Sequence, residues 1–158
     1  MSGKSSSVRR GFHTVTPCLV VKDADKAIEY YKKAFVAEEN YRNYAPDGKS
    51  IMYAELKIGD SVVTLSDEYP QMNSFAPSGN GNVPISLYLY VDNADEVFNR
   101  AISEGGQEVL PMMDAFWGDR YGRLKDPFGH IWSVATHKKD LSPEEMEKAA
   151  RDAFSKMQ

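Results

Sequence analysis

The segment LVVKDADKAIEYYKKAF, residues 19–35, decides the fold because its pattern recurs as LYVDNADEVFNRAISEG, residues 89–105. In each copy a short apolar run leads into Asp or Asn and then into apolar residues at helical spacing, which predicts a strand followed by a helix. Three strand-like runs follow each copy. A repeated unit of this kind needs a second copy to bury its sheet. We therefore predict an α+β fold of two tandem βαβββ modules.

The boundaries of these modules follow from clusters of turn-forming residues. Residues 67–84, DEYPQMNSFAPSGNGNVP, contain Gly, Pro, Asn and Ser throughout, which is typical of a linker. Pro17 predicts that the first strand, within residues 13–21, begins there or lies at a sheet edge. The predicted organisation is a disordered tail (1–12), a first module (13–70), a linker (71–84), a second module (85–138) and a C-terminal helix (139–158).

The C-terminal helix has a strong start signal. Ser142 is expected to cap it, Pro143 to occupy its first turn, and Glu145 to complete a capping box. Its apolar residues fall on one face. We expect that face to pack on the domain or, as an alternative, on a partner subunit.

Composition excludes several functional classes. The chain has 158 residues and a net charge of −4, which argues against nucleic acid as the main partner. No apolar run is long enough to span a membrane, and the start of the chain lacks the apolar core of a signal peptide. Cys18 is the single cysteine, so no intrachain disulfide forms. We expect Cys18 to be buried and the protein to be cytoplasmic.

The stretch DAFWGDRYGRLKDPFGHIWSVATH, residues 114–137, is richer in aromatic and charged residues than a core strand requires. Trp117, Arg120 and Tyr121 suit the rim of a pocket, where aromatic rings stack on planar ligands and arginine binds anions. The alternative is a structural loop in which Asp119 or Asp126 pairs with Arg120 or Arg123. Both interpretations can hold together.

Three motifs in this order resemble the vicinal oxygen chelate superfamily, the glyoxalase and bleomycin-resistance fold, and more narrowly its PhnB-like branch. They are TPCLVVKDADKAIEYYKKAF, DGKSIMYAELKIGDSVVTLSDE and FWGDRYGRLKDPFGHIWSVATH, and the resemblance covers about residues 13 to 140. The resemblance implies that the strands of both modules form a half-open cup around a cavity. It also implies a homodimer.

Metalloenzymes of this superfamily take ligands from four strand positions, usually His, Glu or Gln. The resemblance places these positions at Thr16, Thr64, Ser86 and Ser133. Hydroxyl groups bind Zn²⁺, Ni²⁺ or Fe²⁺ poorly, because these metals prefer imidazole, thiolate or carboxylate donors. We therefore predict neither a metal nor a cofactor.

Residue alternation predicts what lines the cavity. Ser86, Tyr88 and Tyr90 point to one face of their strand, and His137 shares its face with Ser133. An aromatic lining with a few hydroxyl groups suits an apolar organic ligand. The alternative is a filled core that uses tyrosine as bulk. The predicted ligand-binding residues are Thr16, Thr64, Ser86, Tyr88, Tyr90, Trp117, Arg120, Tyr121, Ser133 and His137.

Two strand carboxylates, Glu55 and Glu108, have no evident partner and are expected to be exposed. The favoured function is a metal-free protein that binds a small apolar or aromatic molecule. One alternative is a superfamily enzyme (a lyase, isomerase or dioxygenase) with an atypical site. A further alternative is a dimeric scaffold that binds no ligand.

Overall fold

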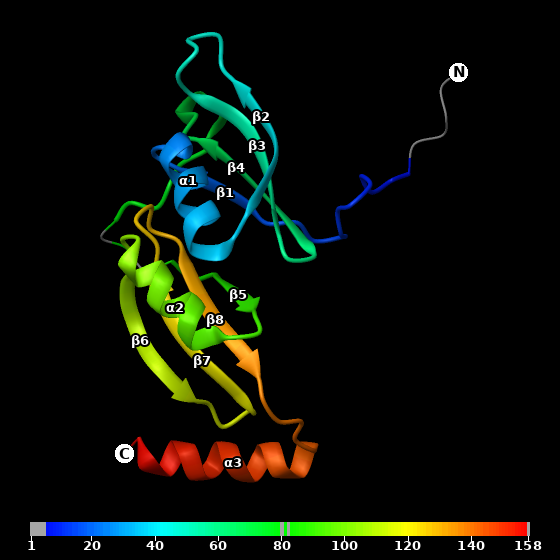
Figure 1. Cartoon of the computed structure of the whole chain (residues 1–158), viewed down its shortest axis with the longest axis vertical. Helices are drawn as coiled ribbons and strands as arrows, with labels where there is room; N and C mark the ends of the chain where they lie inside the picture. Colours follow the sequence, from blue (N-terminus) through cyan, green and yellow to red (C-terminus); the bar gives the residue numbers. More distant parts are fainter. Residues whose placement is uncertain (1–5, 80, 82, 158) are drawn as a thin grey trace. The chain divides into compact units, whose positions relative to one another are not determined.

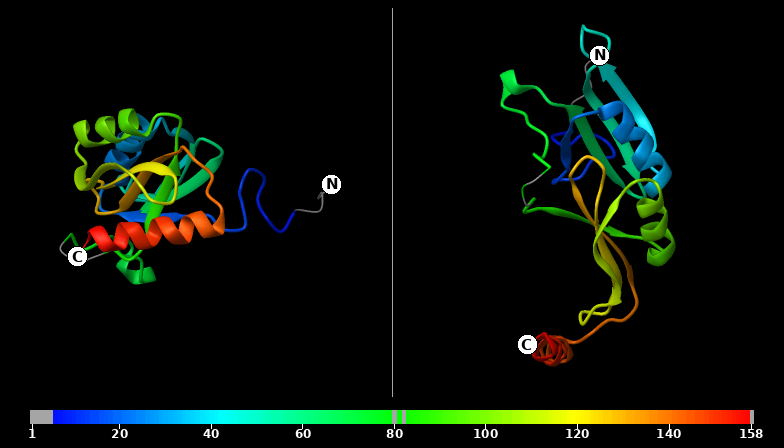
Figure 2. Two further views of the ribbon diagram at one scale, coloured as in Figure 1. Left: turned by 90° about the horizontal axis from the view of Figure 1, so that it is seen from below. Right: turned by 90° about the vertical axis from the view of Figure 1, so that its left-hand side faces the viewer.

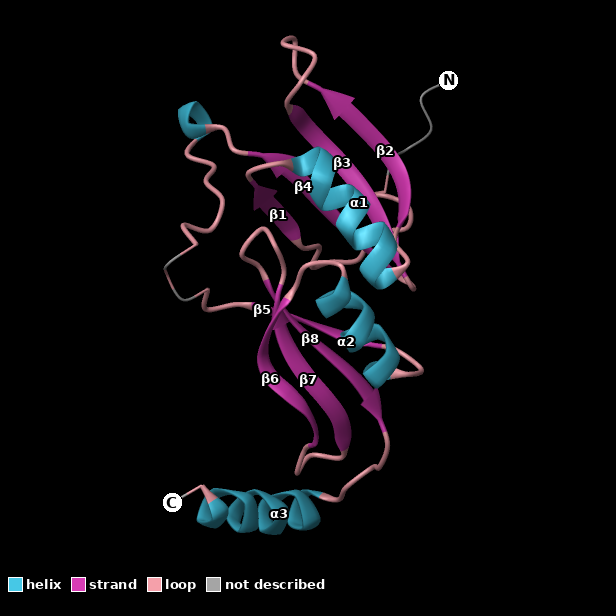
Figure 3. Cartoon of the chain, turned by 60° about the vertical axis from the view of Figure 1, so that its left-hand side comes forward, coloured by secondary structure: helices cyan, strands magenta, loops and turns pink. Residues whose placement is uncertain are grey.

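The computed structural model describes residues 6–79, 81 and 83–157. The chain divides into two compact units, Met1–Asn82 and Val83–Gln158. The predicted disordered tail therefore lies partly outside the described residues, as do two positions of the predicted linker and the last position of the predicted C-terminal range. Each unit contains its own four-stranded sheet (Figures 1 and 3).

The first unit is a βαβββ module. Its sheet has the order β1-β4-β3-β2, in which β1 runs parallel to β4 and the other pairs are antiparallel. The elements are β1 (Cys18–Val21), α1 (Ala24–Phe35), β2 (Glu38–Tyr44), β3 (Ile51–Ile58), β4 (Ser61–Asp67) and the 3₁₀ turn η1 (Pro70–Met72). Helix α1 packs on one face of this sheet (Figures 1 and 2).

The second unit repeats this topology and adds the C-terminal helix. Its sheet has the order β5-β8-β7-β6, again with one parallel pair, β5 and β8. The elements are β5 (Ser86–Tyr90), α2 (Ala94–Ser103), β6 (Gln107–Asp114), β7 (Asp119–Lys125), β8 (Ile131–His137) and α3 (Pro143–Lys156). The predicted α+β fold of two βαβββ modules is confirmed.

Helix α2 can pack closely on its sheet because of a glycine in β7. Gly122 faces Phe98 of α2, and a Cβ atom at this position would lie 3.0 Å from the Phe98 ring and 2.6 Å from Sδ of Met112. A larger residue here would force the Met112 and Phe98 side chains to shift. This contact fixes which face of the second sheet α2 covers, and thereby which face remains for other roles.

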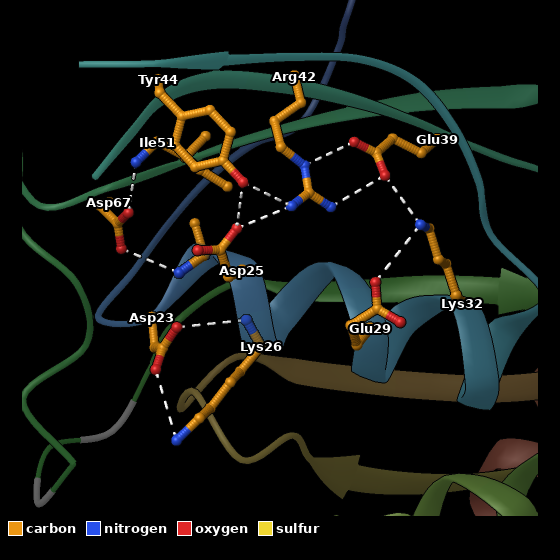
Figure 4. Close-up of polar contacts among 11 residues, drawn as sticks. Asp23, Asp25, Lys26, Glu29, Lys32, Glu39, Arg42, Tyr44, Ile51 and Asp67 are labelled. Carbon is orange, nitrogen blue, oxygen red and sulfur yellow. Dashed lines mark hydrogen bonds and ion pairs between the residues drawn. The ribbon is translucent and has the colours of Figure 1, made fainter. Parts of the chain in front are cut away.

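The starts of α1 and α2 are each hydrogen-bonded to the last strand of their own unit. Oδ1 of Asp67 accepts a hydrogen bond of 2.9 Å from the backbone N–H of Ala24 (Figure 4), and Thr136 Oγ1 accepts one of 2.9 Å from Ala94. Asp67 Oδ2 also accepts a 2.7 Å hydrogen bond from Ile51. These bonds satisfy backbone donors that have no partner within the helix.

An ion-pair network joins α1 to β2 (Figure 4). The Arg42 guanidinium donates to both carboxylate oxygens of Glu39, at 2.7 and 2.9 Å, and to Asp25 at 2.8 Å. Lys32 donates to Glu39 at 2.8 Å. The hydrogen bonds from Arg42, aided by that from Lys32, outweigh burial and hold the pKa of Glu39 below its usual range. This network stabilises the helix-covered side of the first unit.

Two details of the first strand differ from expectation. Residues 13–17 are not strand, because the strand begins at Cys18, directly after Pro17. The strand lies at a sheet edge, as Pro17 predicted. The prediction that Cys18 is buried is wrong. Its side chain lies on the sheet face opposite α1, where the Thr64 hydroxyl donates to Sγ at 2.8 Å.

Helix α3 has the predicted start. The Ser142 hydroxyl accepts from the Glu145 N–H, and the Glu145 carboxylate accepts from the Ser142 N–H, so the capping box is confirmed. None of the residues of α3 is buried. Packing of its apolar face on the domain is therefore not observed. No helix in the described part of the chain is long and apolar enough to cross a membrane.

Candidate ligand-binding site

The face of the second sheet opposite α2 is here called the open face. Its members follow from alternation and register: Tyr88 pairs with Ser133, and Asp119 with His137. Helix α2 takes the other face, where Phe98 meets Gly122. The open face consists of Ser86, Tyr88 and Tyr90 on β5, Ser133, Ala135 and His137 on β8, and Asp119, Tyr121 and Arg123 on β7.

A buried carboxylate organises one end of this face. Asp119 Oδ2 accepts hydrogen bonds from the Tyr88 hydroxyl at 2.6 Å, from Trp117 Nε1 at 3.0 Å and from the Tyr90 hydroxyl at 3.3 Å. Its Oδ1 lies 2.7 Å from His137 Nδ1. The Asp119 side chain is only 1% exposed. We call these five residues the Asp119 cluster.

The hydrogen bonds of the cluster decide the charge of Asp119. Burial by itself would raise the pKa of this carboxyl, but the hydrogen bonds from Tyr88, His137, Trp117 and Tyr90 outweigh it and lower the pKa below its ordinary value. Burial and the neighbouring Asp119 carboxylate raise the pKa of Tyr88. At neutral pH the cluster therefore holds a carboxylate and un-ionised tyrosines.

His137 bridges the buried carboxylate to an exposed one. Its Nε2 lies 2.6 Å from Oδ1 of Asp140, whose side chain is 99% exposed. Both ring nitrogens can donate only when the imidazole is protonated. The hydrogen bonds to Asp119 and Asp140 accordingly raise the pKa of His137. His137 thus serves the cluster as a hydrogen-bond donor.

Aromatic rings continue from the cluster across the open face. Tyr121 is buried and stacks on Tyr88 with 6.1 Å between centroids, while Trp117 lies 4.9 Å from Tyr121. Tyr88 and Tyr90 lie 5.0 Å apart and remain 39% and 62% exposed. The result is an accessible aromatic surface supported from below by a buried ring.

The loop before β7 places Trp117 through a glycine. Gly118 has a φ of 98°, a conformation that other residues rarely adopt. Its carbonyl accepts from the backbone N–H groups of Lys138 and Lys139, at 2.9 and 3.0 Å. A Cβ atom here would collide with the Lys139 carbonyl oxygen. These two hydrogen bonds hold the loop against the end of β8, beside His137.

Most of the predicted binding residues of the second module lie on or beside the open face, and Arg120 does not. Arg120 lies on the α2 side of β7, where its NH2 group donates to Asp95 at 2.9 Å and its NH1 group lies 3.5 Å from Asp114. The predicted pairing of Arg120 with Asp119 or Asp126 is therefore wrong. Its partners Asp95 and Asp114 hold it at the helix start, as Asp25 holds Arg42 in the first unit.

The remaining predicted residues lie in the first unit or in the middle of the open face. The Thr16 hydroxyl donates to the His13 carbonyl before β1, and Thr64 lies on β4. Ser133 is fully buried, and its hydroxyl accepts a 3.3 Å hydrogen bond from Arg123 Nε. Among the described residues, no group of three or more His, Cys, Asp or Glu side chains is arranged to hold a metal ion.

Sequence reasoning missed two carboxylates. Asp119 was considered only as one possible partner of an arginine, in the alternative of a structural loop, whereas it is the centre of the aromatic cluster. Its position two residues before Tyr121 was a usable signal, because alternation places both on one face. Glu55 was expected to be exposed and is buried, while Glu108 is exposed as expected.

These features define a protein of two βαβββ modules. The face of its second sheet that lies opposite α2 carries aromatic side chains. A family model for the Glyoxalase/Bleomycin resistance protein/Dioxygenase superfamily matches residues 11–134, and the chain belongs to this superfamily. The predicted resemblance is thereby confirmed. The closure of both sheets into a cup stays a prediction.

Two known proteins are similar to this chain over most of its length. The uncharacterized protein Rv0887c of Mycobacterium tuberculosis is 41% identical over 138 residues, which cover 85% of this chain and 81% of the relative. The crystal structure of TioX from Micromonospora sp. ML1 matches with a TM-score of 0.61 and 26% identity, covering 78% of this chain and 97% of TioX.

More distant structures show the fold alone. A PhnB protein from Bacillus cereus, described as a putative 3-demethylubiquinone-9 3-methyltransferase, has a TM-score of 0.63 at 16% identity and covers 78% of this chain and 99% of its own. The fosfomycin resistance protein FosX from Listeria monocytogenes has a TM-score of 0.62 at 18% identity and covers 85% and 97%.

Proposed function

We propose that this protein binds a planar, largely apolar small molecule on the open face of the second sheet and does not transform it. The observation that carries the proposal is the Asp119 cluster. A buried carboxylate fixes Tyr88, Tyr90 and Trp117 through their polar atoms, and the exposed parts of the Tyr88 and Tyr90 rings remain for a ligand. Rings held in place lose little entropy on binding, so such a surface favours affinity.

The chemistry of the cluster favours binding over acid–base catalysis. Asp119 accepts four hydrogen bonds from protein groups, which occupies the acceptor sites that a general base would use. Tyr88 has a raised pKa and is a poor base at neutral pH. The cluster therefore supports a positioning role for Asp119.

The positions where superfamily metalloenzymes place their ligands also favour binding without a metal. The single hydrogen of the Thr64 hydroxyl faces Cys18 Sγ at 2.8 Å and the Pro17 carbonyl oxygen at 3.3 Å. Ser133 accepts from Arg123. Hydroxyl groups engaged in this way are weak donors for transition metals.

Arg123 offers a polar end to the proposed site. Its guanidinium lies on the same face as Tyr121, two residues along β7, and its Nε–H is directed to Ser133. A guanidinium carries five N–H donors, so it can hold a ligand oxygen as well. We therefore propose a planar aromatic ligand that carries a carboxylate or a similar acceptor.

The test is a calorimetric titration with 2-naphthoate, a planar aromatic carboxylate. Tyr90→Ala removes an exposed ring whose hydrogen bond to Asp119 is the longest of the cluster, and we expect affinity to fall about tenfold. Phe154→Ala on α3 is the matched control, because Phe154 is 66% exposed, similar to Tyr90. It should bind like the wild type.

Equal affinity of the wild type and Tyr90→Ala would exclude the open face as the site. Absence of binding by the wild type to 2-naphthoate and to a panel of planar aromatic carboxylates would favour a scaffold without a ligand. Conversion of the probe or of superfamily substrates would favour an enzyme.

A further inference from the structure

The first sheet carries a buried carboxylate on the face opposite α1. Glu55 on β3 pairs in register with Thr64 on β4, which pairs with Cys18 on β1, so these three side chains share that face. The Glu55 side chain is only 9% exposed. Its neighbours in β3, Ala54 and Leu56, point to the helix side and are fully buried.

The charge of Glu55 is balanced by a residue outside the sheet. Arg9 NH1 lies 2.7 Å from Glu55 Oε1 and donates to the Tyr53 hydroxyl at 3.0 Å. The Tyr53 hydroxyl in turn donates to Glu55 Oε1 at 2.8 Å. Arg9 NH1, the Tyr53 hydroxyl and Glu55 Oε1 therefore form a closed triangle of polar contacts around one guanidinium nitrogen.

The two partners differ greatly in exposure. The Arg9 side chain is 66% exposed and lies in a segment before β1 without helix or strand. Its guanidinium also stands over the Phe12 ring, 4.7 Å from the centroid. Glu55 lies within strand β3, whereas Arg9 lies in a turn before β1, where its backbone carbonyl accepts a 2.9 Å hydrogen bond from the nearby Phe12 N–H. The cation can therefore leave while the carboxylate stays.

A buried carboxylate without a cation is costly, because little water reaches it to replace the lost charge partner. When Arg9 leaves, the site favours another cation of the same shape. A planar amidinium or guanidinium can donate to Glu55 and Tyr53 in the same way, and an attached aromatic ring adds apolar contact.

We propose that Glu55 and Tyr53 form a binding site for the amidinium or guanidinium group of an organic cation, and that Arg9 occupies this site as a tethered competitor. The residues of this site belong to the first unit, whereas the aromatic open face belongs to the second. The ligand of this site has the opposite charge to that proposed for Arg123.

The probe is benzamidine, a planar aromatic amidine, and the measurement is calorimetric titration of the full chain. Arg9→Gln removes the competitor, and we expect benzamidine to bind at least about tenfold more tightly than to the wild type, because a tethered group competes at millimolar effective concentration. Arg10→Gln is the matched control. It removes the same charge from the neighbouring position and should bind like the wild type.

Arg9→Gln combined with Glu55→Gln should lose the gain. Thermal melting of each variant checks that it is folded. An excess of 2-naphthoate should leave benzamidine binding unchanged, which separates this site from the one proposed in the second unit. Equal affinities of Arg9→Gln and Arg10→Gln, binding that survives Glu55→Gln, or no binding by any variant would each overturn the proposal.

Discussion

Replacement of Asp119 by Asn tests the cluster most sharply, because it keeps the shape of the side chain and removes its charge. The carboxylate accepts four hydrogen bonds and is 1% exposed. If the amide oxygen keeps the three donors on Oδ2, its NH₂ group must face His137. The imidazole then has to be neutral and accept, so the charged interaction is lost.

The magnitude follows from the number and type of the lost interactions. A hydrogen bond to a charged group contributes about 1.5–3 kcal/mol and a neutral one about 1 kcal/mol. Weakening several of them in a buried site should destabilise the protein by about 2–4 kcal/mol. For a chain of this size, we expect a fall in melting temperature of about 5–15 °C. Thermal unfolding followed by circular dichroism measures it.

Asp140→Asn provides the control. Both carboxylates contact His137, at 2.7 and 2.6 Å, and they differ mainly in burial, 1% against 99% exposed. Exposed ion pairs contribute little, so the melting temperature of Asp140→Asn should change by about 1 °C or less. Equal effects of the two substitutions would refute the view that the buried carboxylate organises the aromatic face.

Three further predictions concern the loop before β7, the titration of His137 and a carboxylate of the first unit. Gly118→Ala should destabilise the protein by about 2–4 kcal/mol in urea unfolding, since it combines an unfavourable φ with a collision at the Lys139 carbonyl; wild-type stability would contradict this. The raised pKa of His137 contributes stability that is full below its unfolded pKa of about 6.5 and is lost as pH rises through the folded pKa. Melting temperatures between about pH 5.5 and 8.5 should fall over that window less in His137→Gln than in the wild type; parallel curves would contradict it. Asp67→Ala removes two hydrogen bonds to backbone N–H groups, at α1 and β3, and should lower stability by about 2–3 kcal/mol in urea unfolding; a change near zero would show that water replaces the carboxylate.

The fold was predictable because it rests on periodicity. Helical spacing and strand alternation of apolar residues arise because these residues are buried on one face of a helix or strand. The duplicated segment shows both patterns twice. Alternation also placed Tyr88, Tyr90 and His137 correctly within their strands. The sequence placed the first strand within residues 13–21 and left its start open, because apolar and β-branched residues before Pro17 also look like strand in sequence. Only the register shows that pairing begins at Cys18.

The polar contacts were much less predictable. Tyr88 and Asp119 are 31 positions apart, and Arg9 and Glu55 are 46 positions apart, so no local pattern connects them. A carboxylate in a strand looks exposed until its partner is known, which is why Glu55 was misjudged. Arg120 was assigned to the ligand face because of its aromatic neighbours, although its odd spacing from Asp119 and Tyr121 places it on the other side of the strand.

The central claim is that the open face of the second sheet binds a planar aromatic ligand without a metal. The most direct measurement is a calorimetric titration of the chelator-treated, metal-free protein with 2-naphthoate, repeated after addition of Zn²⁺, Ni²⁺, Mn²⁺ or Fe²⁺. The account predicts binding to the metal-free protein with an affinity that the metals do not change. Binding that requires a metal, together with a rise in melting temperature as that metal saturates the protein, would contradict it.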